Sequence, residues 1–187
     1  MVALQESTQI FETVLNDLAP DECQQIVDIL KSFVHPDQTE VESSLVRRLT
    51  GRSFSRAEKI KLELHSLLGY FERRRELLDD SLTASEVAAL LGTSRQTSHD
   101  RLKNKTLLGV LDRGAYRFPS WQFDAEGPDG VIEGFPEVLR ALNMSDFAKL
   151  NWLVRSNPIL DGLTPIAALK QGLKERVIQE ALGVGVL

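Results

Sequence analysis

The chain has 187 residues, of which 42% are hydrophobic and 26% are charged; this composition suits one or two packed domains and excludes collagen-like, disordered and disulfide-framework classes. Its net charge of −5 excludes a basic field over the whole chain, so any affinity for nucleic acid has to be local. The single Cys23 cannot form an intrachain disulfide, the amino terminus lacks a signal-peptide pattern, and no apolar stretch approaches the roughly 20 residues that span a bilayer. We therefore expect a cytoplasmic protein without a membrane partner.

Residues 1–80 carry a net charge of −5 and have the pattern of helices throughout. Capping boxes begin at Thr39 and at Ser55, and the helix that opens at Ser55 is expected to run to about Asp79. Its apolar stripe predicts core packing, with a dimer interface as the alternative. Near its carboxyl end, Arg73–Arg75 suit the helix dipole, and phosphate contact remains the second option.

Residues 81–123 are the only basic block, with a net charge of +3, and they begin with two short helices joined by a tight turn. Thr83 starts the first helix with a capping box, Gly92 ends it, and Ser94 caps the second helix. Ala88 stands four residues before Gly92, so the helices can cross closely around a residue that tolerates positive φ. The spacing predicts a helix-turn-helix.

The second of these helices is the expected recognition helix in the major groove. We expect Arg95, Gln96 and Thr97 to specify bases, because Arg suits guanine and Gln suits adenine, while hydroxyls and cations hold phosphates. A dimer would read half-sites one helical turn apart, ~34 Å. The expected DNA contacts are Ser94, Arg95, Gln96, Thr97, His99, Arg101, Lys103, Lys105 and Arg113.

The stretch LLGVLDRGAYRF predicts two strands around a turn at 112–114. This hairpin would serve as a wing, with Arg113 at its tip and Arg117 on its second strand placed to touch the DNA backbone or minor groove. Aromatic residues are expected to pack the wing onto the helices, with nucleobase stacking as the alternative. These aromatic residues are Tyr116, Phe118, Trp121 and Phe123.

The basic block resembles an excisionase-like winged helix-turn-helix, on the stretch ALLGTSRQTSHDRLKNKTLLGV and the closing FPSWQFD. The resemblance covers about forty residues and implies double-stranded DNA as a partner. Thr93 and Ser98 depart from it, because such motifs place aliphatic core residues there. Their polar atoms have to find partners or remain in solvent.

The rest of the chain carries a net charge of −3, and it predicts a loop followed by short helices. DAEGPDGVIE is rich in Gly, Pro and acids, as linkers are. Beyond it, Ser145 and Thr164 are expected N-caps, and Pro165 suits a first helical position. We expect a mainly α fold with these parts: a helical segment 1–80 as a candidate oligomerisation region, a winged helix-turn-helix with a short β-hairpin at 81–123, a linker at 124–133, and a carboxyl-terminal helical bundle at 134–187.

The stretch WLVRSNPILDGLTPIAALKQG resembles the toxin-binding domain of the Xre/MbcA/ParS antitoxin family, with its W-L helix, N-P and G-x-T-P. The resemblance implies a DNA-binding antitoxin, a homodimer or larger oligomer, that regulates its own promoter and covers the active-site cleft of a RES-type toxin that consumes NAD. Turn and cap chemistry explains the same residues without a toxin. The toxin contacts that the resemblance implies are Trp152, Asn157, Pro158, Leu163, Thr164, Pro165, Leu169 and Leu187.

No pattern of catalytic or metal-binding residues stands out. His35, His65 and His99 are scattered, Cys23 is alone, and phosphate-loop, dinucleotide-binding and hydrolase motifs are missing. We expect no catalytic site, no metal, no cofactor and no enzymatic activity. Two alternatives to an antitoxin remain open: a stand-alone transcription regulator without a toxin, and a protein-interaction adaptor with a degenerate helix-turn-helix.

Overall fold

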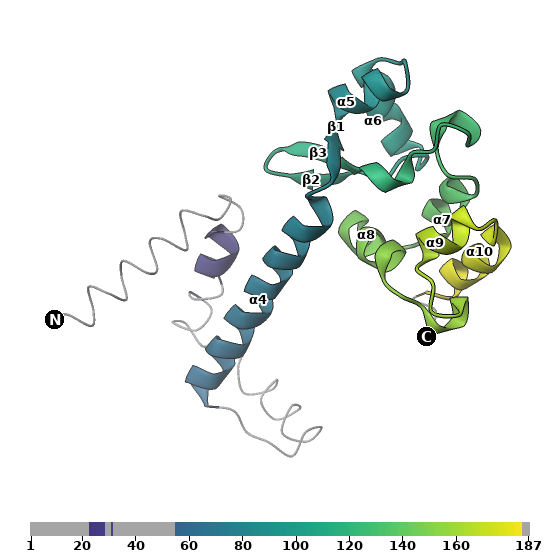
Figure 1. Ribbon diagram of the computed structural model, residues 1–187. Coiled ribbons are helices and arrows are strands. Elements are labelled where there is room, and N and C mark those ends of the chain that lie inside the picture. The colour runs from purple at the N-terminus through teal and green to yellow at the C-terminus, as the bar shows by residue number, and fades with distance from the viewer. Residues whose placement is uncertain (1–22, 29–30, 32–54, 185–187) are drawn as a thin grey trace. The chain divides into compact units, whose positions relative to one another are not determined.

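The computed structural model describes residues 23–28, 31 and 55–184 (Figure 1). Contacts divide the chain into two compact units, Met1–Arg73 and Arg74–Leu187. The described part is mainly helical with a small three-stranded antiparallel sheet, which confirms the expected class. Most of the helices predicted before residue 55, with the capping box at Thr39, lie outside the described residues.

The helix predicted from Ser55 is present as α4 (Arg56–Leu78). The capping box is confirmed, because the Ser55 backbone N–H donates to the Glu58 carboxylate at 2.8 Å and the Glu58 N–H donates to the Ser55 hydroxyl at 3.3 Å. Hydrogen bonds from the Ser55 hydroxyl and backbone N–H lower the pKa of Glu58, since they favour its charged form. At the other end of the apolar stripe, Phe71 is fully buried.

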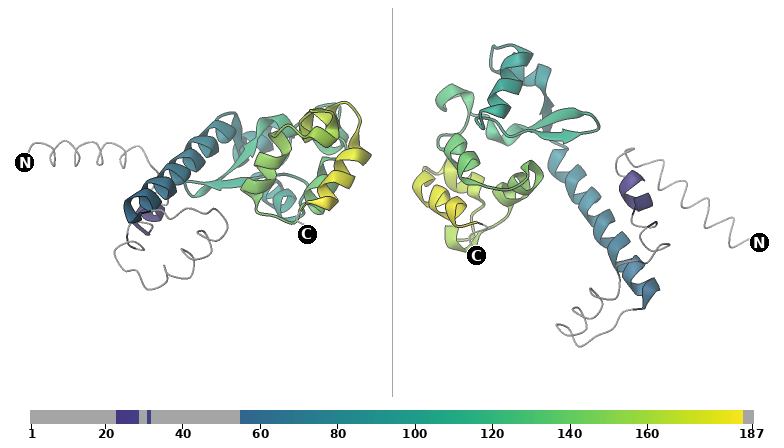
Figure 2. Two further views of the ribbon diagram at one scale, coloured as in Figure 1. Left: turned by 90° about the horizontal axis from the view of Figure 1, so that it is seen from below. Right: turned by 180° about the vertical axis from the view of Figure 1, so that it is seen from behind.

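The sheet has the order β1-β3-β2, with β1 (Ser81–Thr83), β2 (Val110–Asp112) and β3 (Ala115–Pro119). The predicted hairpin is confirmed as β2–β3, and it projects from its unit in both Figure 1 and Figure 2. Strand β1 was not predicted. Three residues are too few to show the alternation by which a strand is recognised in a sequence.

Between β1 and β2 lie α5 (Ala84–Leu90) and α6 (Arg95–Lys103). Thr83 caps α5 in a complete capping box with Glu86, and Ser94 caps α6 by accepting from the Thr97 backbone N–H, as predicted. Gly92 adopts φ +62, the left-handed conformation that a tight turn requires. Hydrogen bonds from the Thr83 backbone N–H and hydroxyl lower the pKa of Glu86.

Short helices follow the sheet, and the predicted caps at Ser145 and Thr164 are confirmed. Pro165 occupies the first helical position of its helix. These elements are η1 (Ser120–Gln122), η2 (Pro128–Gly130), α7 (Phe135–Ala141), α8 (Asp146–Val154), η3 (Pro158–Leu160), α9 (Pro165–Lys170) and α10 (Lys174–Gly183).

Two buried clusters hold residues 74–184 together. The larger core is built mostly by α7, α8, α9 and α10, and the smaller core consists of Ala84, Val87, Leu107, Phe118 and Val131. The predicted linker contains no α-helix, but Val131 belongs to the smaller core and Ile132 to the larger. This segment is therefore a packed loop within one compact unit, and burial of its apolar pair distinguishes it from a free linker.

Candidate nucleic-acid interface

Helix α6 buries one face and exposes the opposite one. Ser98 is buried, and Leu102 packs against the smaller core. Helical spacing then turns Gln96, Asp100 and Lys103 away from the core, and all three are exposed. We call these three residues the outward face of α6. Of these three residues, the sequence predicted DNA contacts for Gln96 and Lys103.

Ser98 and Thr93, the two polar residues at positions where the motif has aliphatic ones, place their hydroxyl groups in different environments. The Ser98 hydroxyl donates to the backbone oxygen of Ala84 at 3.4 Å, across the interface between α6 and α5. Thr93 is exposed in the turn between these helices. Neither residue therefore leaves a buried polar atom without a partner, and the two helices still pack closely.

The hairpin covers one edge of the outward face. His99 on α6 packs edge-on against Tyr116 on β3, with ring centroids 5.9 Å apart and an interplanar angle of 71°. Phe118 lies in the smaller core, and Phe123 packs against it. Trp121 packs edge-on against Phe135 in the larger core. The expected packing role of these aromatic residues is confirmed.

The loop after η1 covers the other edge of α6, where a hollow of about 770 Å³ is lined by Thr97, Arg101, Phe123 and Asp129, among others. Arg101 donates from Nη1 to the backbone oxygen of Asp129 at 2.9 Å and from Nε to the Thr106 hydroxyl at 3.4 Å. Burial lowers the pKa of Arg101, and the charge of Asp129 opposes that shift.

The DNA contact predicted for Arg101 stays a prediction, and the structure gives its guanidinium partners within the fold. Its guanidinium fastens the loop to α6 and lies on the loop edge of the helix, away from the outward face. Thr97 lies on this same edge, and its hydroxyl is 3.0 Å from that of Ser94. Ser94 serves as the cap of α6. These three residues hold the helix and its flanking loop in place.

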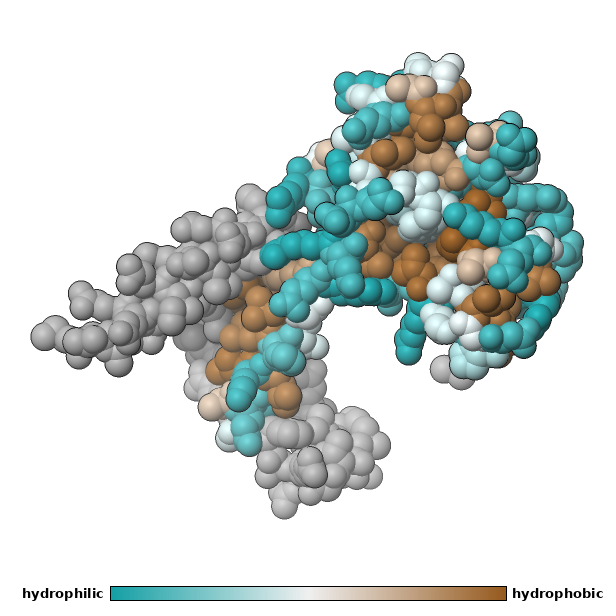
Figure 3. All heavy atoms as spheres, in the orientation of Figure 1, coloured by the Kyte–Doolittle hydropathy of each residue, from teal (hydrophilic) through white to brown (hydrophobic). Residues whose placement is uncertain are grey.

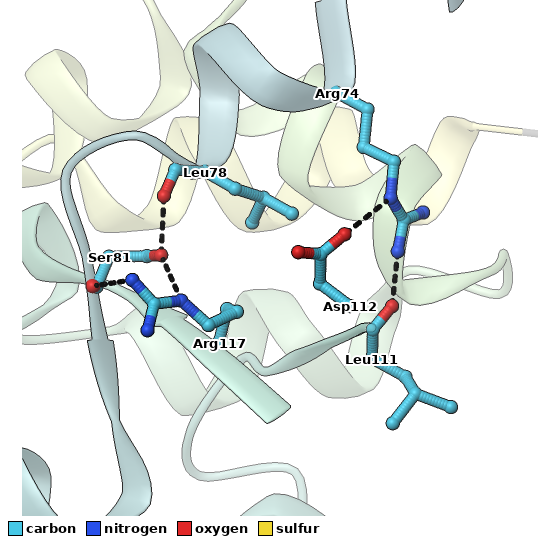
Figure 4. Close-up of polar contacts among 6 residues, drawn as sticks. All are labelled: Arg74, Leu78, Ser81, Leu111, Asp112 and Arg117. Carbon is cyan, nitrogen blue, oxygen red and sulfur yellow. Dashed lines mark hydrogen bonds and ion pairs between the residues drawn. The ribbon is translucent and has the colours of Figure 1, made fainter. Parts of the chain in front are cut away.

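Several cations of the basic block have no intramolecular partner among the described residues. In the part of the chain that the structure describes, four exposed cations of the basic block make no side-chain hydrogen bond or ion pair: Arg95, Lys103, Lys105 and Arg113. Arg117 differs from them, because Nε donates to the Ser81 hydroxyl at 3.0 Å and Nη2 donates to the Ser81 backbone oxygen at 2.8 Å (Figure 4). Arg117 therefore links β3 to β1, and its expected contact with DNA stays a prediction.

Two of these cations occupy unusual backbone positions. Arg113 adopts φ 47 in the turn of the hairpin, where it precedes Gly114 at φ 78. Lys105 adopts φ 54 two residues after the last residue of α6. Gly and Asn are preferred at both kinds of position, because positive φ is strained for other side chains. Local backbone chemistry therefore does not explain why cations stand there.

Asp100 is the residue of the outward face that the sequence analysis missed. The Gln96 side-chain amide donates from Nε2 to its Oδ1 at 3.0 Å, within one turn of α6. The i, i+4 spacing of a glutamine and an aspartate is the signal that would have revealed the pair.

The carboxyl-terminal end of α4 contacts strand β2 of the hairpin. Arg74 donates from Nε to the Asp112 carboxylate at 3.1 Å and from Nη2 to the backbone oxygen of Leu111 (Figure 4). Its guanidinium also lies 5.6 Å from the centre of the Phe147 ring. The sequence offered two roles for Arg73–Arg75, a helix-dipole partner and a phosphate clamp. The structure gives the middle arginine a third role, as an anchor for β2.

Several residues implied as toxin contacts serve the carboxyl-terminal fold itself. Pro165 and Leu169 are buried within this chain, and the partner contact that the resemblance implies for them stays a prediction. The Thr164 hydroxyl accepts from the Ala167 N–H at 3.1 Å as a helix cap. Trp152 and Leu163 pack partly against the larger core, and Leu187 lies outside the described residues.

The remaining implied contacts, Asn157 and Pro158, lie in an exposed, hydrogen-bonded turn at η3. Asn157 accepts from the Ile159 N–H at 2.9 Å and donates to the Glu180 carboxylate at 3.2 Å. Arg176 donates to the Ile159 backbone oxygen at 2.7 Å, which ties the turn to α10. Pro158 is exposed, and the Ile159 side chain is 64% exposed. Figure 3 shows that hydrophobic residues reach the surface in several places among hydrophilic ones.

Within residues 23–28, 31 and 55–184, no group of three His, Cys, Asp or Glu side chains is arranged to hold a metal ion. Among these same residues, no helix is both long enough and apolar enough to cross a bilayer.

The chain matches no protein-family model and no curated protein. A solved structure titled "NMR structure of Rv2175c" is 22% identical to it, over 55% of this chain and 78% of that chain, with a TM-score of 0.48. This similarity does not place the chain in a family.

Proposed function

We propose that residues 81–123 bind double-stranded DNA as a winged helix-turn-helix, with α6 in the major groove and the β2–β3 hairpin as the wing. The observation that carries this proposal is the set of exposed, unpartnered cations on α6, just after it and at the hairpin tip. Every phosphate that such a cation neutralises releases counterions, which favours association even though the whole chain is acidic. Arg101 and Arg117, the other cations of the block, are engaged within the fold.

The strained cations give independent support to the proposal. Strained backbone is concentrated at functional sites, where the surrounding structure maintains it. Arg113 at the tip of the hairpin suits a contact with the DNA backbone or minor groove, and Lys105 suits a phosphate beside the recognition helix. Gly, Asn and Asp are the residues preferred at positive φ, and Asp129 and Asp161 are the other non-glycine residues that adopt it among the described residues.

The DNA affinities of Lys103→Ala and Gln96→Ala, measured at several salt concentrations, distinguish a phosphate contact from a base contact. Lys103→Ala is expected to lower affinity for all duplexes and to reduce the slope of log K against log salt by about 1, because one phosphate contact is lost. Gln96→Ala is expected to cost about 1–3 kcal/mol on the cognate duplex alone. Fluorescence anisotropy measures both, with a duplex selected by the wild-type protein and an unrelated duplex.

Lys170→Ala is the matched control, since it removes an exposed lysine from α9, and its affinity should equal that of the wild type. Equal losses for Lys103→Ala and Gln96→Ala on both duplexes would contradict the division of roles. A wild-type protein without salt-dependent DNA binding would contradict the proposal and favour the adaptor.

As a second function, we propose that residues 134–184 bind a protein partner of the kind that the antitoxin resemblance implies, a RES-type toxin that consumes NAD. The exposed turn at Pro158–Ile159 favours this function. It presents a large apolar side chain on backbone that Asn157 and Arg176 already hold, so little ordering is required when a partner binds. Inhibition would follow from covering the toxin's cleft, without chemistry by this chain.

Ile159→Asp is expected to abolish retention of the toxin, because a charge would be buried without a partner in the interface. The measurement is affinity capture from native lysate, followed by an assay of the retained protein for NAD consumption. Leu90→Asp, at a leucine of similar exposure (56%) on α5, should retain the toxin. If the wild-type protein retains no NAD-consuming protein, the toxin is excluded and the stand-alone regulator remains.

A further inference from the structure

Asp100 is an acid in the middle of a surface that we propose to face a polyanion. It is the only acidic residue of α6, and it is exposed on the outward face between Gln96 and Lys103. Among the described residues, no cation lies within ion-pair distance of its carboxylate, although Arg95 and Lys103 are exposed cations on the same helix. Its charge is therefore not used to hold a neighbouring side chain of opposite sign.

An acid at this position lowers affinity for most DNA sequences. Phosphates repel it, and in the major groove guanine presents the acceptors N7 and O6 while thymine presents O4. Only cytosine N4 and adenine N6 present an amino donor there. Adenine N7 is an acceptor beside that donor, whereas cytosine has no acceptor next to N4 on this edge, so a carboxylate is better matched to cytosine.

The neighbouring glutamine orients the carboxylate for such a contact. Gln96 donates to Oδ1 of Asp100 at 3.0 Å, which leaves Oδ2 without a partner among the described residues. The same hydrogen bond fixes one Nε2 hydrogen of Gln96 and leaves its Oε1 open. The pair therefore presents two acceptors on the face where base edges are expected, in the first two turns of the helix.

We infer that Asp100 is a specificity-determining residue, which accepts a hydrogen bond from the N4 amino group of a cytosine next to the base read by Gln96. This inference rests on the proposed DNA-binding function. Asp100 would then strengthen binding to duplexes with a cytosine at this position and weaken binding to all other duplexes.

The test compares wild type with Asp100→Asn and Asp100→Ala. Wild-type protein first selects a preferred duplex from a randomised pool, and anisotropy titrations then use that duplex, its single-base-pair variants and an unrelated duplex. We expect the wild type to prefer one C·G pair over the alternatives by about ten-fold to a hundred-fold. Asp100→Ala should lose that preference, and Asp100→Asn should keep only part of it, because one of the two acceptor oxygens becomes a donor. Both variants should bind the unrelated duplex several-fold more tightly than the wild type, since each removes the negative charge.

Glu137→Gln removes one negative charge from the exposed surface of α7 and is the matched control, which should keep the preference. An unchanged midpoint of thermal unfolding establishes that each variant is folded. If Asp100→Ala keeps the cytosine preference, or if the Asp100 variants bind all duplexes more tightly by one common factor, the inference is overturned while the proposed function stands. If the wild type binds no duplex in a salt-dependent manner, the proposed function fails first and the inference falls with it.

Discussion

Gln122→Ala is expected to lower the free energy of unfolding by about 3–5 kcal/mol, because it leaves buried backbone groups without partners. Gln122 is completely buried. Its Nε2 donates to the backbone oxygens of Leu108 and Pro119, both at 2.9 Å, and its Oε1 accepts from the Leu108 N–H at 2.8 Å. Denaturation in urea, followed by tryptophan fluorescence, measures the loss.

The location of Gln122 explains the size of this effect. Leu107 belongs to the smaller core and Leu108 to the larger, so the chain passes between two apolar clusters at this point. Its peptide groups find no water there, and the amide of Gln122 replaces the backbone partners that a strand would supply. Each unsatisfied buried group costs about 1–3 kcal/mol, and the effects of neighbouring groups do not add fully.

Two further variants test whether the loss of stability in Gln122→Ala comes from the buried amide. Gln179→Ala, at an exposed position of α10, is expected to change stability by no more than about 0.5 kcal/mol. Gln122→Glu places a carboxyl at the buried site, where desolvation raises its pKa above the unfolded value of about 4.3. Its stability should be highest below that value and should fall as the pH rises through the raised, folded-state pKa. A loss for Gln122→Ala no greater than that for Gln179→Ala would refute the role of the amide.

Arg74→Ala is expected to lower the free energy of unfolding by about 2–3 kcal/mol. Removal of one partner from a buried ion pair costs roughly 3–5 kcal/mol. The cost is smaller here, because the Asp112 side chain is 29% exposed and water can solvate the carboxylate that is left. The Leu111 backbone oxygen and the face of Phe147 lose the guanidinium as well. Denaturant titration measures the loss, and amide hydrogen exchange should become faster in β2 and β3.

Arg74→Lys provides the comparison, since it keeps the charge but not the fork that reaches Asp112 and Leu111 together. We expect the free energy of unfolding of Arg74→Lys to lie between those of Arg74→Ala and the wild type. Arg140→Ala, at an exposed arginine of α7, controls for the loss of a surface cation. If exchange in the hairpin is the same in Arg74→Ala as in wild type, Arg74 does not anchor β2.

Features that depend on a few neighbouring residues were predicted correctly from the sequence. Thr83 and Ser94 cap their helices, and Gly92 turns the chain between them, because a cap or a left-handed turn is decided within about four residues. The hairpin at Arg113–Gly114 was predicted for the same reason. Helix α4 followed from its apolar period and its capping box.

Features that depend on partners distant in the chain were decided only by the tertiary structure. Arg101 and Lys103 are cations two residues apart on one helix, yet Arg101 bonds the loop at Asp129, whereas Lys103 remains exposed. Leu169 and Gln122 are buried because segments far apart in the sequence close around them. The sequence by itself determined the helices, their caps and the charge of the basic block. Packing between remote segments decided which of those side chains stay free to bind, because burial and hydrogen-bond partners are set by three-dimensional neighbours and not by spacing along the chain.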